Sequence, residues 1–329
     1  MTTQTMDVFV DSDMGWDDWC AISLLAKSPN INIVGLSITG CGEAYLSSAL
    51  QNALDILSLL GKPDIPVGIG AVFPSSYSNV FPGSFRQTMS TLMGYTLQKS
   101  TVDPKALKSA DEVLNTALTN SPDLIYLSIG GFTNLHNYLN GGKYQVVPKS
   151  VVSMCGAVNV PGNINTLFPQ AYPENDKAEW NIFIDPASAG YVINYYQTNK
   201  LALRISPLDA SYQVPLTNYI INSLTMNKSQ DALILFLSYI LSTRFDQAKQ
   251  GGYLEYFYDP LAASIIIDPS LTEDIRGDFS VNTAYDEEKN CLGALSFKPS
   301  ADATSCYGLI KSPNDFYNLF LDTICSKST

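Results

Sequence analysis

Short apolar runs alternate along this chain with longer segments in which apolar residues recur every three or four positions. Runs of the first kind are typical of β-strands, and segments of the second kind predict α-helices. The predicted strands are residues 7–10, 32–39, 66–69, 124–129, 151–154 and 201–205. The predicted helices are residues 17–27, 46–60, a helix that starts at residue 133, and residues 186–196, 216–224, 229–249 and 260–267.

Glycine-containing turns separate several of these strands from the helices that follow them. Gly130-Gly131 ends one strand and Cys155-Gly156-Ala157 ends the next. A repeated strand–turn–helix order favours an α/β fold with an open, mostly parallel β-sheet flanked by helices. No break in composition marks a linker, so we predict a single domain over residues 1–329, with a core at about 7–270. Residues 271–329 show no clear period, and we expect an irregular C-terminal extension there.

Composition and charge exclude several classes of protein. The 329 residues are 46% hydrophobic and 15% charged, which excludes a disordered tail, a coiled coil and a collagen-like repeat. The net charge of −12 repels a phosphate backbone, so we expect no nucleic-acid partner. No apolar run reaches about 18 residues, so we expect no membrane span. Residues 1–5 lack the basic and apolar regions of a signal peptide, which predicts a cytoplasmic protein unless a leader has been removed before secretion.

The six cysteines show no C-x-x-C spacing, which argues against a structural zinc site. Cys20, Cys41 and Cys155 lie in apolar stretches and are expected to be buried. Cys291, Cys306 and Cys325 lie in a polar stretch near the end of the chain. A Cys291–Cys306 disulfide is one arrangement that the sequence allows there, although sequence does not fix the connectivity.

Four carboxylates fall within eight residues after the first predicted strand. Alternation along the strand puts Asp11 and Asp13 on one face, Gly15 lets the backbone turn, and Asp17 and Asp18 open the helix. Such a cluster repels itself unless a cation is present, and hard oxygen ligands suit Ca²⁺ or Mg²⁺. We therefore predict a cation site built from several strands, with ordinary helix capping as the alternative.

Two further segments carry candidate polar groups. Asp259 precedes Pro260 and an apolar run, which on its own is typical of a helix N-terminus. Glu179 and Asn181 are expected to alternate in an extended stretch, so that both face one pocket. Carboxylate acceptors beside amide groups suit a hydroxyl-rich ligand such as a sugar. A surface loop is an equally good interpretation of this second segment.

Taken together, these segments resemble the inosine-uridine preferring nucleoside hydrolase family over about residues 7–270. They occur in the family's order and at comparable spacing. The resemblance is carried by Asp11-x-Asp13-x-Gly15-x-Asp17-Asp18, Gly130-Gly131-Phe132-Thr133-Asn134, Gly162-Asn163, Glu179-Trp180-Asn181-Ile182 with Asp185-Pro186, and Asp259-Pro260-Leu261-Ala262.

This resemblance implies Ca²⁺-dependent hydrolysis of the N-glycosidic bond of a ribonucleoside to free base and ribose, as in purine or pyrimidine salvage. It implies one Ca²⁺ held by Asp13, Asp18, Asp259 and the backbone carbonyl of Ile129. Asp13 would also act as the general base on a metal-bound water. The resemblance also implies a homo-oligomer, either a dimer or a tetramer.

The same resemblance implies a ribose-binding set. By position, the residues that would bind the ribose hydroxyls or line the sugar pocket are Asp17, Asn163, Glu179, Asn181 and Met154. An N-glycosidic bond breaks through an oxocarbenium-like transition state, so a carboxylate such as Glu179 beside the sugar would stabilise the developing charge.

Two departures from the family's pattern indicate a divergent subgroup. Many members carry a leaving-group His immediately before the last metal-binding Asp, and here that position is Tyr258. The only histidine, His136, is expected to be a packing or surface residue. Tyr258 is the candidate proton donor or stacking partner for the base, and Trp16 or Trp180 could also stack on it. Glu43 stands where the classical members have an Asn that contacts ribose.

Two other functions fit parts of this pattern. A catalytically weak nucleoside-binding protein could keep the calcium pocket, and the missing histidine favours it. An unrelated α/β enzyme could use Mg²⁺ for phosphoryl transfer, since clustered aspartates suit that chemistry as well. The sequence contains no G-x-x-x-x-G-K-[ST] phosphate-binding loop.

Overall fold

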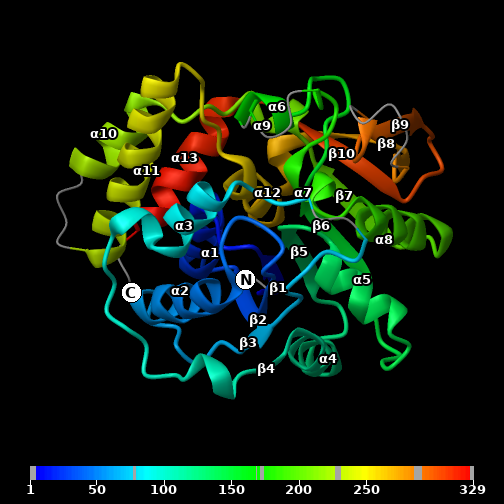
Figure 1. Cartoon of the computed structure of the whole chain (residues 1–329), viewed down its shortest axis with the longest axis horizontal. Helices are drawn as coiled ribbons and strands as arrows, with labels where there is room; N and C mark the ends of the chain where they lie inside the picture. Colours follow the sequence, from blue (N-terminus) through cyan, green and yellow to red (C-terminus); the bar gives the residue numbers. More distant parts are fainter. Residues whose placement is uncertain are drawn as a thin grey trace.

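Ten β-strands form one sheet in the computed structural model, which describes residues 5–76, 79–167, 169–170, 174–226, 231–284 and 291–326 (Figure 1). The strand order is β4-β3-β2-β1-β5-β6-β7-β10-β8-β9. Neighbouring strands are parallel from β4 through β10, whereas β8 and β9 pair in antiparallel fashion. The strands are β1 Met6–Ser12, β2 Ile31–Ile38, β3 Val67–Ile69, β4 Lys108–Ser109, β5 Ile125–Ile129, β6 Ser150–Met154, β7 Ala202–Ser206, β8 Thr272–Val281, β9 Leu295–Pro299 and β10 Ser305–Ile310.

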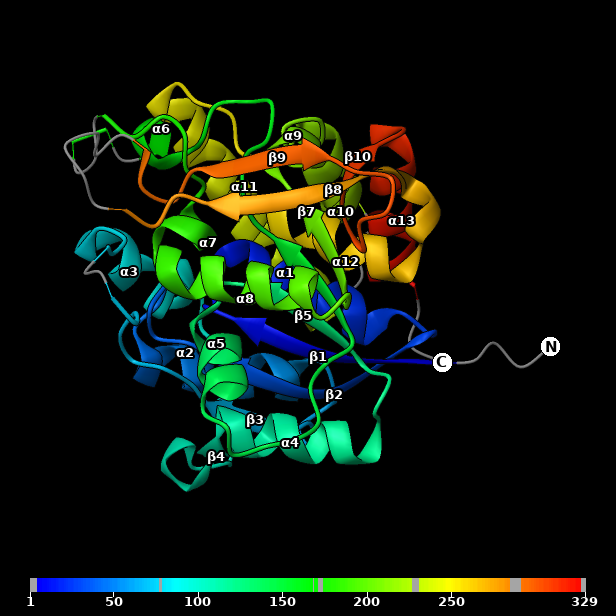
Figure 2. The ribbon, with the colours of Figure 1, turned by 90° about the vertical axis from the view of Figure 1, so that its right-hand side faces the viewer.

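Helices cover both faces of this sheet (Figure 2). The α-helices are α1 Trp16–Lys27, α2 Leu46–Leu59, α3 Gly83–Ser90, α4 Ala110–Asn120, α5 Thr133–Asn140, α6 Ile164–Leu167, α7 Trp180–Phe183, α8 Pro186–Thr198, α9 Leu208–Ser211, α10 Asn218–Met226, α11 Ala232–Gly251, α12 Tyr258–Ile267 and α13 Pro313–Ile324. Short 3-10 turns lie at η1 Leu92–Gly94, η2 Pro104–Ala106 and η3 Pro269–Leu271.

The central strand β1 shows why the sheet needs helices on both sides. Val8 and Val10 are buried in the core that contains α1, α2 and α10 to α13. Phe9, between them, is buried in the opposite core with α4, α5 and α8. Because side chains alternate across a strand, a run that is apolar at every position is buried on both faces. The predicted open, mostly parallel sheet flanked by helices is confirmed.

The predicted irregular extension over residues 271–329 is wrong. Strands β8, β9 and β10 and helix α13 lie there, and β10 continues the parallel sheet beside β7. Strand β8 has only three buried residues and carries the exposed Glu273, Asp274, Arg276 and Asp278, so it contains no apolar run. A strand with one solvated face gives a weaker pattern than a fully buried one.

Two smaller features of the sequence can also be compared with the structure. Cys20, Cys41 and Cys155 are buried, as predicted. Cys306 is a free thiol, so the Cys291–Cys306 disulfide is not formed. None of the helices in the described residues is both long and apolar enough to cross a membrane.

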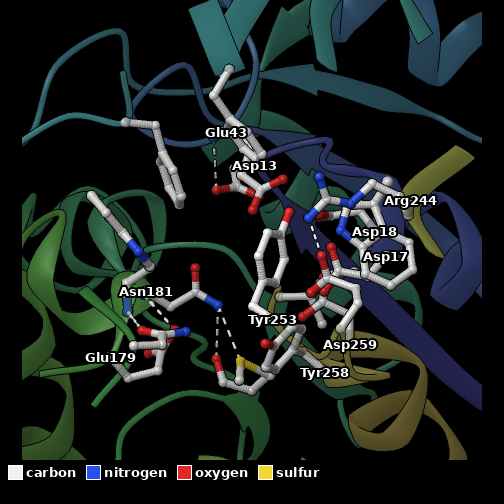
Figure 3. Close-up of a pocket in the computed structure, with 18 residues that line it drawn as sticks. Asp13, Asp17, Asp18, Glu43, Glu179, Asn181, Arg244, Tyr253, Tyr258 and Asp259 are labelled. Atoms are coloured by element: carbon white, nitrogen blue, oxygen red, sulfur yellow. Dashed lines mark hydrogen bonds and ion pairs between the residues drawn. The ribbon is translucent and has the colours of Figure 1, made fainter. Parts of the chain in front are cut away.

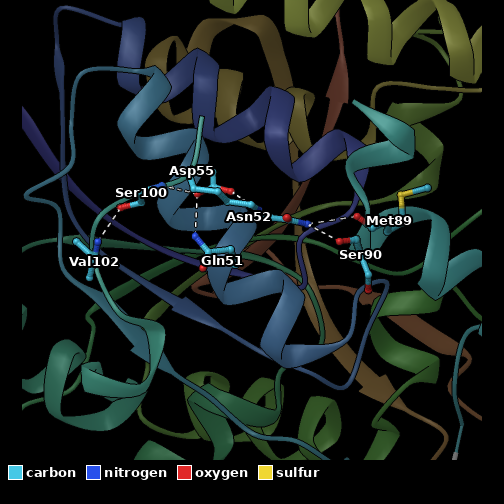
Figure 4. Close-up of polar contacts among 8 residues, drawn as sticks. Gln51, Asn52, Asp55, Met89, Ser90, Ser100 and Val102 are labelled. Carbon is cyan, nitrogen blue, oxygen red and sulfur yellow. Dashed lines mark hydrogen bonds and ion pairs between the residues drawn. The ribbon is translucent and has the colours of Figure 1, made fainter. Parts of the chain in front are cut away.

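Helix α2 anchors the long connection that carries α3 (Figure 4). The Asn52 side-chain nitrogen donates to the carbonyl oxygens of Met89 at 3.4 Å and Ser90 at 3.3 Å. The Asp55 carboxylate accepts from the backbone nitrogen of Ser100 at 2.7 Å. Both side chains are buried in α2, so their hydrogen bonds fix the C-terminal end of α3 and the loop around Ser100.

Candidate functional site

The loops after β1, β5 and β6 and the start of α12 border one pocket (Figure 3). In an open parallel sheet this is the edge where ligands bind. With the exception of Asp11, the residues singled out for the site from the sequence line this pocket, and those residues are Asp13, Trp16, Asp17, Asp18, Glu43, Ile129, Met154, Asn163, Glu179, Trp180, Asn181, Tyr258 and Asp259.

Three carboxylates form the candidate metal centre. Ligand atoms of Asp17, Asp18 and Asp259 all lie within 4.8 Å of one another, and the three residues are buried. Burial and the neighbouring carboxylates raise the pKa of Asp18 and of Asp259 well above the ordinary value, and that of Asp17 to about 7. Hard oxygen donors held together against their own repulsion fit a divalent cation such as Ca²⁺.

Local hydrogen bonds hold Asp18 at the start of α1. The Ser12 hydroxyl donates to Asp18 Oδ1 at 2.5 Å, and the Gly15 backbone nitrogen donates to Oδ2 at 2.8 Å. Between them Met14 adopts a left-handed backbone conformation, with φ of 62°, which is uncommon for a residue with a side chain. The turn therefore directs several acidic side chains into the same space.

Asp13 is held from the other side by the loop after β2. The Glu43 backbone nitrogen donates to Asp13 Oδ2 at 3.0 Å. Burial raises the pKa of Asp13 to about 6. A carboxylate with a pKa near neutrality can accept a proton from water at physiological pH. Asp11, by contrast, does not border the pocket, because its carboxylate accepts from the Ser37 hydroxyl at 2.6 Å and the Asn134 amide at 2.7 Å.

Glu179 and Asn181 do not alternate in an extended stretch as predicted. Glu179 caps the short helix α7, and its carboxylate accepts from the backbone nitrogens of Asn181 at 2.8 Å and Gly156 at 3.0 Å. Burial raises the pKa of Glu179 to about 7. Both side chains nevertheless line the pocket. Asn181 lies two positions after the cap, and its side-chain nitrogen donates to the Met154 carbonyl oxygen at 3.0 Å.

Five residues that no sequence pattern indicated also line the pocket: Phe81, Phe85, Arg244, Tyr253 and Glu255. They come from α3, α11 and the loops next to them, which carry no motif. One feature of the sequence could have indicated Tyr253, because the pair Gly251-Gly252 follows a long predicted helix. Gly252 has φ of 71°, and a Cβ at residue 251 would lie 2.5 Å from the Tyr253 ring. The glycine pair thus folds Tyr253 back against the helix end.

Arg244 and Glu255 form a buried ion pair at this side of the pocket. The Arg244 guanidinium carbon lies 5.6 Å from the Trp16 ring centre and 5.7 Å from that of Phe85. Glu179 and Asn181 lie across the pocket from Arg244 (Figure 3). Arg244 therefore lies on the side of the pocket that holds Asp17 and Asp18, opposite the carboxylate and amide groups of Glu179 and Asn181.

His136 is a packing residue, as predicted. It lies on α5, where Nδ1 is 2.7 Å from the Ser188 hydroxyl and the ring packs against Tyr191. It does not line the pocket.

Comparisons with known proteins agree with this geometry. A family model described as "Inosine-uridine preferring nucleoside hydrolase" matches residues 8–307. An uncharacterized protein of Schizosaccharomyces pombe is 29% identical over 211 residues, which are 64% of this chain and 63% of that protein. A probable uridine nucleosidase of Oryza sativa is 26% identical over 278 residues, 84% of this chain and 78% of that protein. The solved structure of a plant nucleoside hydrolase, 20% identical, superposes with a TM-score of 0.81 over 98% of this chain and 99% of the other.

Proposed function

Because the chain belongs to the inosine-uridine preferring nucleoside hydrolase family, we propose that it hydrolyses the N-glycosidic bond of a ribonucleoside to free base and ribose. The observation that carries the proposal is the buried group Asp17, Asp18 and Asp259 next to Asp13 in one pocket. A nucleoside is the proposed partner, and relatives described as uridine nucleosidases support this class of substrate. We also propose that the protein acts in base salvage and that it assembles as a homo-oligomer.

The donor set fits calcium. The proposed ligands are the carboxylates of Asp13, Asp18 and Asp259 and the Ile129 carbonyl oxygen. Of these, Asp18 and Asp259 cluster with Asp17, whereas Asp13 and Ile129 line the same pocket outside that cluster. When bound, calcium would bind the ribose hydroxyls and make the attacking water more acidic.

Each residue of the pocket has its own proposed role in the reaction. Asp13, fixed by the Glu43 backbone nitrogen, accepts a proton from the attacking water. Glu179 places a carboxylate beside the sugar, where it stabilises the positive charge that develops in an oxocarbenium-like transition state. Asn163 and Asn181 offer amide groups to the ribose hydroxyls, and Asn163 is held by the Trp180 backbone nitrogen at 3.1 Å.

At the base end, Tyr258 takes the position that many family members give to a leaving-group His. We place this chain in a divergent subgroup for that reason. Trp16 and Trp180 line the same pocket and would contact the base. Glu43 would lie near the ribose, where classical members use Asn. We also propose that residues 1–329 form a single domain.

The test is release of free ribose from a panel of purine and pyrimidine nucleosides, with and without a calcium chelator. We expect ribose that disappears when calcium is removed and returns when calcium is restored. Nucleoside binding in calcium without any ribose would instead support the catalytically weak binding protein. Phosphomonoester hydrolysis without ribose release would support the phosphoryl-transfer alternative.

A further inference from the structure

Arg244 lines the pocket beside Trp16 and next to Asp17 and Asp18 (Figure 3), and it lies outside the segments that carry the family resemblance. We infer that Arg244, held by Glu255, stabilises the negative charge of the departing base in place of a proton-donating histidine. This inference rests on the proposed function. It adds one residue that would touch the reacting base, Arg244, and one positioning residue, Glu255.

Hydrogen bonding leaves one nitrogen of this guanidinium, Nε, without a partner. Arg244 is only 6% exposed. Its Nη2 donates to Glu255 Oε2, and its Nη1 donates to Gln247 Oε1 at 3.1 Å. Its Nε is buried and has no hydrogen-bond partner in the structure. A buried charged donor without a partner is costly, and a ligand in the pocket would satisfy it.

The aromatic rings hold this group in place. The guanidinium lies near the Trp16 and Phe85 rings, at 5.6 Å and 5.7 Å from their centres. Guanidinium groups bind favourably against aromatic faces at such distances. Glu255 is itself 2% exposed, so the ion pair cannot rearrange without exposing or stranding a charge. Arg244 is therefore a fixed donor rather than a mobile surface cation.

Charge makes the position of Arg244 informative. Of the described residues that line the pocket, it alone carries a positive charge, and every other charged one is Asp or Glu. A departing base that takes the electron pair of the glycosidic bond becomes an anion. The acidic groups that line the pocket would repel this anion, and among the described lining residues Arg244 is the one cationic group that could offset that repulsion. If Arg244 served only to balance the charge of the acidic cluster, its unpartnered Nε would have no role.

The step balances without proton donation by Arg244. The C1′–N bond breaks, and its electron pair passes to the base nitrogen. The water oxygen forms a bond to C1′, and one water proton passes to Asp13. The base leaves as an anion that accepts a hydrogen bond from the guanidinium, and it then takes a proton from solvent. Arg244 keeps its protons throughout, because an arginine does not act as an acid near neutral pH.

The experiment compares a nucleoside with 4-nitrophenyl riboside, whose leaving group is already stable as an anion. The double variant R244Q/E255Q removes both charges, so no unpaired buried charge remains, and R244K keeps a positive charge. The matched control is R276Q, because Arg276 is exposed on β8 and donates to the Ala303 carbonyl oxygen. Calcium affinity is measured by calorimetry for each protein.

We expect R244Q/E255Q to lower kcat on the nucleoside by about 100-fold, the typical effect of losing one preorganised donor. Its kcat on 4-nitrophenyl riboside and its calcium affinity should stay near those of wild type, and R244K should recover part of the nucleoside rate. E255Q alone should also slow only the nucleoside. Equal losses on both substrates, or a weakened calcium site, would overturn the inference. A wild-type protein inactive on both substrates would instead refute the proposed function.

Discussion

Gly42 leaves the space that the Asp13 carboxylate occupies. A Cβ at residue 42 would lie 1.7 Å from Asp13 Oδ2, which is far inside contact distance. The loop after β2 thus approaches the general-base candidate through a residue without a side chain, and the next residue, Glu43, donates its backbone nitrogen to the same oxygen. Position 42 therefore controls where Asp13 points.

We expect G42A to displace Asp13 and to lower kcat by about 100-fold, the scale of loss for a small misplacement of a catalytic group. The matched control is G83A, because a Cβ there would meet only the Tyr45 hydroxyl, at an ordinary contact distance of 3.5 Å. Rates of ribose release and thermal melting curves check both variants. A G42A protein that folds and turns over like G83A would show that Asp13 does not need this contact.

The two glycines at the end of α11 should give different effects when each is replaced by alanine. G251A would push on the Tyr253 ring, so we expect KM to rise about fivefold, which is about 1 kcal/mol of binding free energy. G252A places a side chain in a left-handed conformation with nothing within 4 Å, so it should lower stability by about 1 kcal/mol and leave KM unchanged. The same KM change in both variants would refute a role for Tyr253 at the pocket.

Calcium should stabilise the folded protein through the carboxylate cluster. At a free concentration about 100 times its Kd, a bound ion adds about 2.7 kcal/mol to the free energy of unfolding. We expect D18N and D259N to lose most of this gain, whereas D123N, at an exposed carboxylate paired with Lys149, should keep it. Denaturant unfolding with calcium or with chelator measures the difference. A gain that survives in both cluster variants would place the ion elsewhere.

The pH dependence of stability follows from Glu179. Burial raises its pKa in the folded protein from 4.5 to about 7. Between these two values the folded protein keeps a proton that the unfolded chain has released. The free energy of unfolding in chelator should therefore fall as pH rises from about 4.5 to about 7, by about 3 kcal/mol from this group.

The variant E179Q has no carboxyl group to titrate, so its stability should decline less over the same pH range. E273Q, at an exposed position of β8, is the control and should follow wild type. Denaturant unfolding at several pH values measures both. An unchanged decline in E179Q would mean that burial does not perturb Glu179 in this way.

The parts of the site that were predictable from sequence are those in which several chemical groups lie close together along the chain. Asp13, Asp17 and Asp18 share one turn after a buried strand, so strand period and charge repulsion already indicate their common location. Arg244 and Glu255 could not be placed in this way. They reach the pocket only because α11 and the loop after it pack against elements that are more than 200 residues away in the sequence, such as α1.

Errors of secondary structure had a similar origin. Residues 272–281 form β8, but only some of its positions are buried, and its charged residues hide the strand pattern. Helix α7 has only four residues and begins at an acidic cap, Glu179, which a search for apolar periods does not detect. In both cases the tertiary partners, rather than the local sequence, select the conformation.

The most direct test of the account is the rate of ribose release by D13N in saturating calcium. Asn keeps the shape of the side chain but cannot accept the proton of the attacking water. We expect kcat to fall by about 100-fold to 10,000-fold, while the melting temperature with chelator stays near that of wild type. Ribose release by D13N at the wild-type rate would contradict the central claim that Asp13 is the general base of a nucleoside hydrolase.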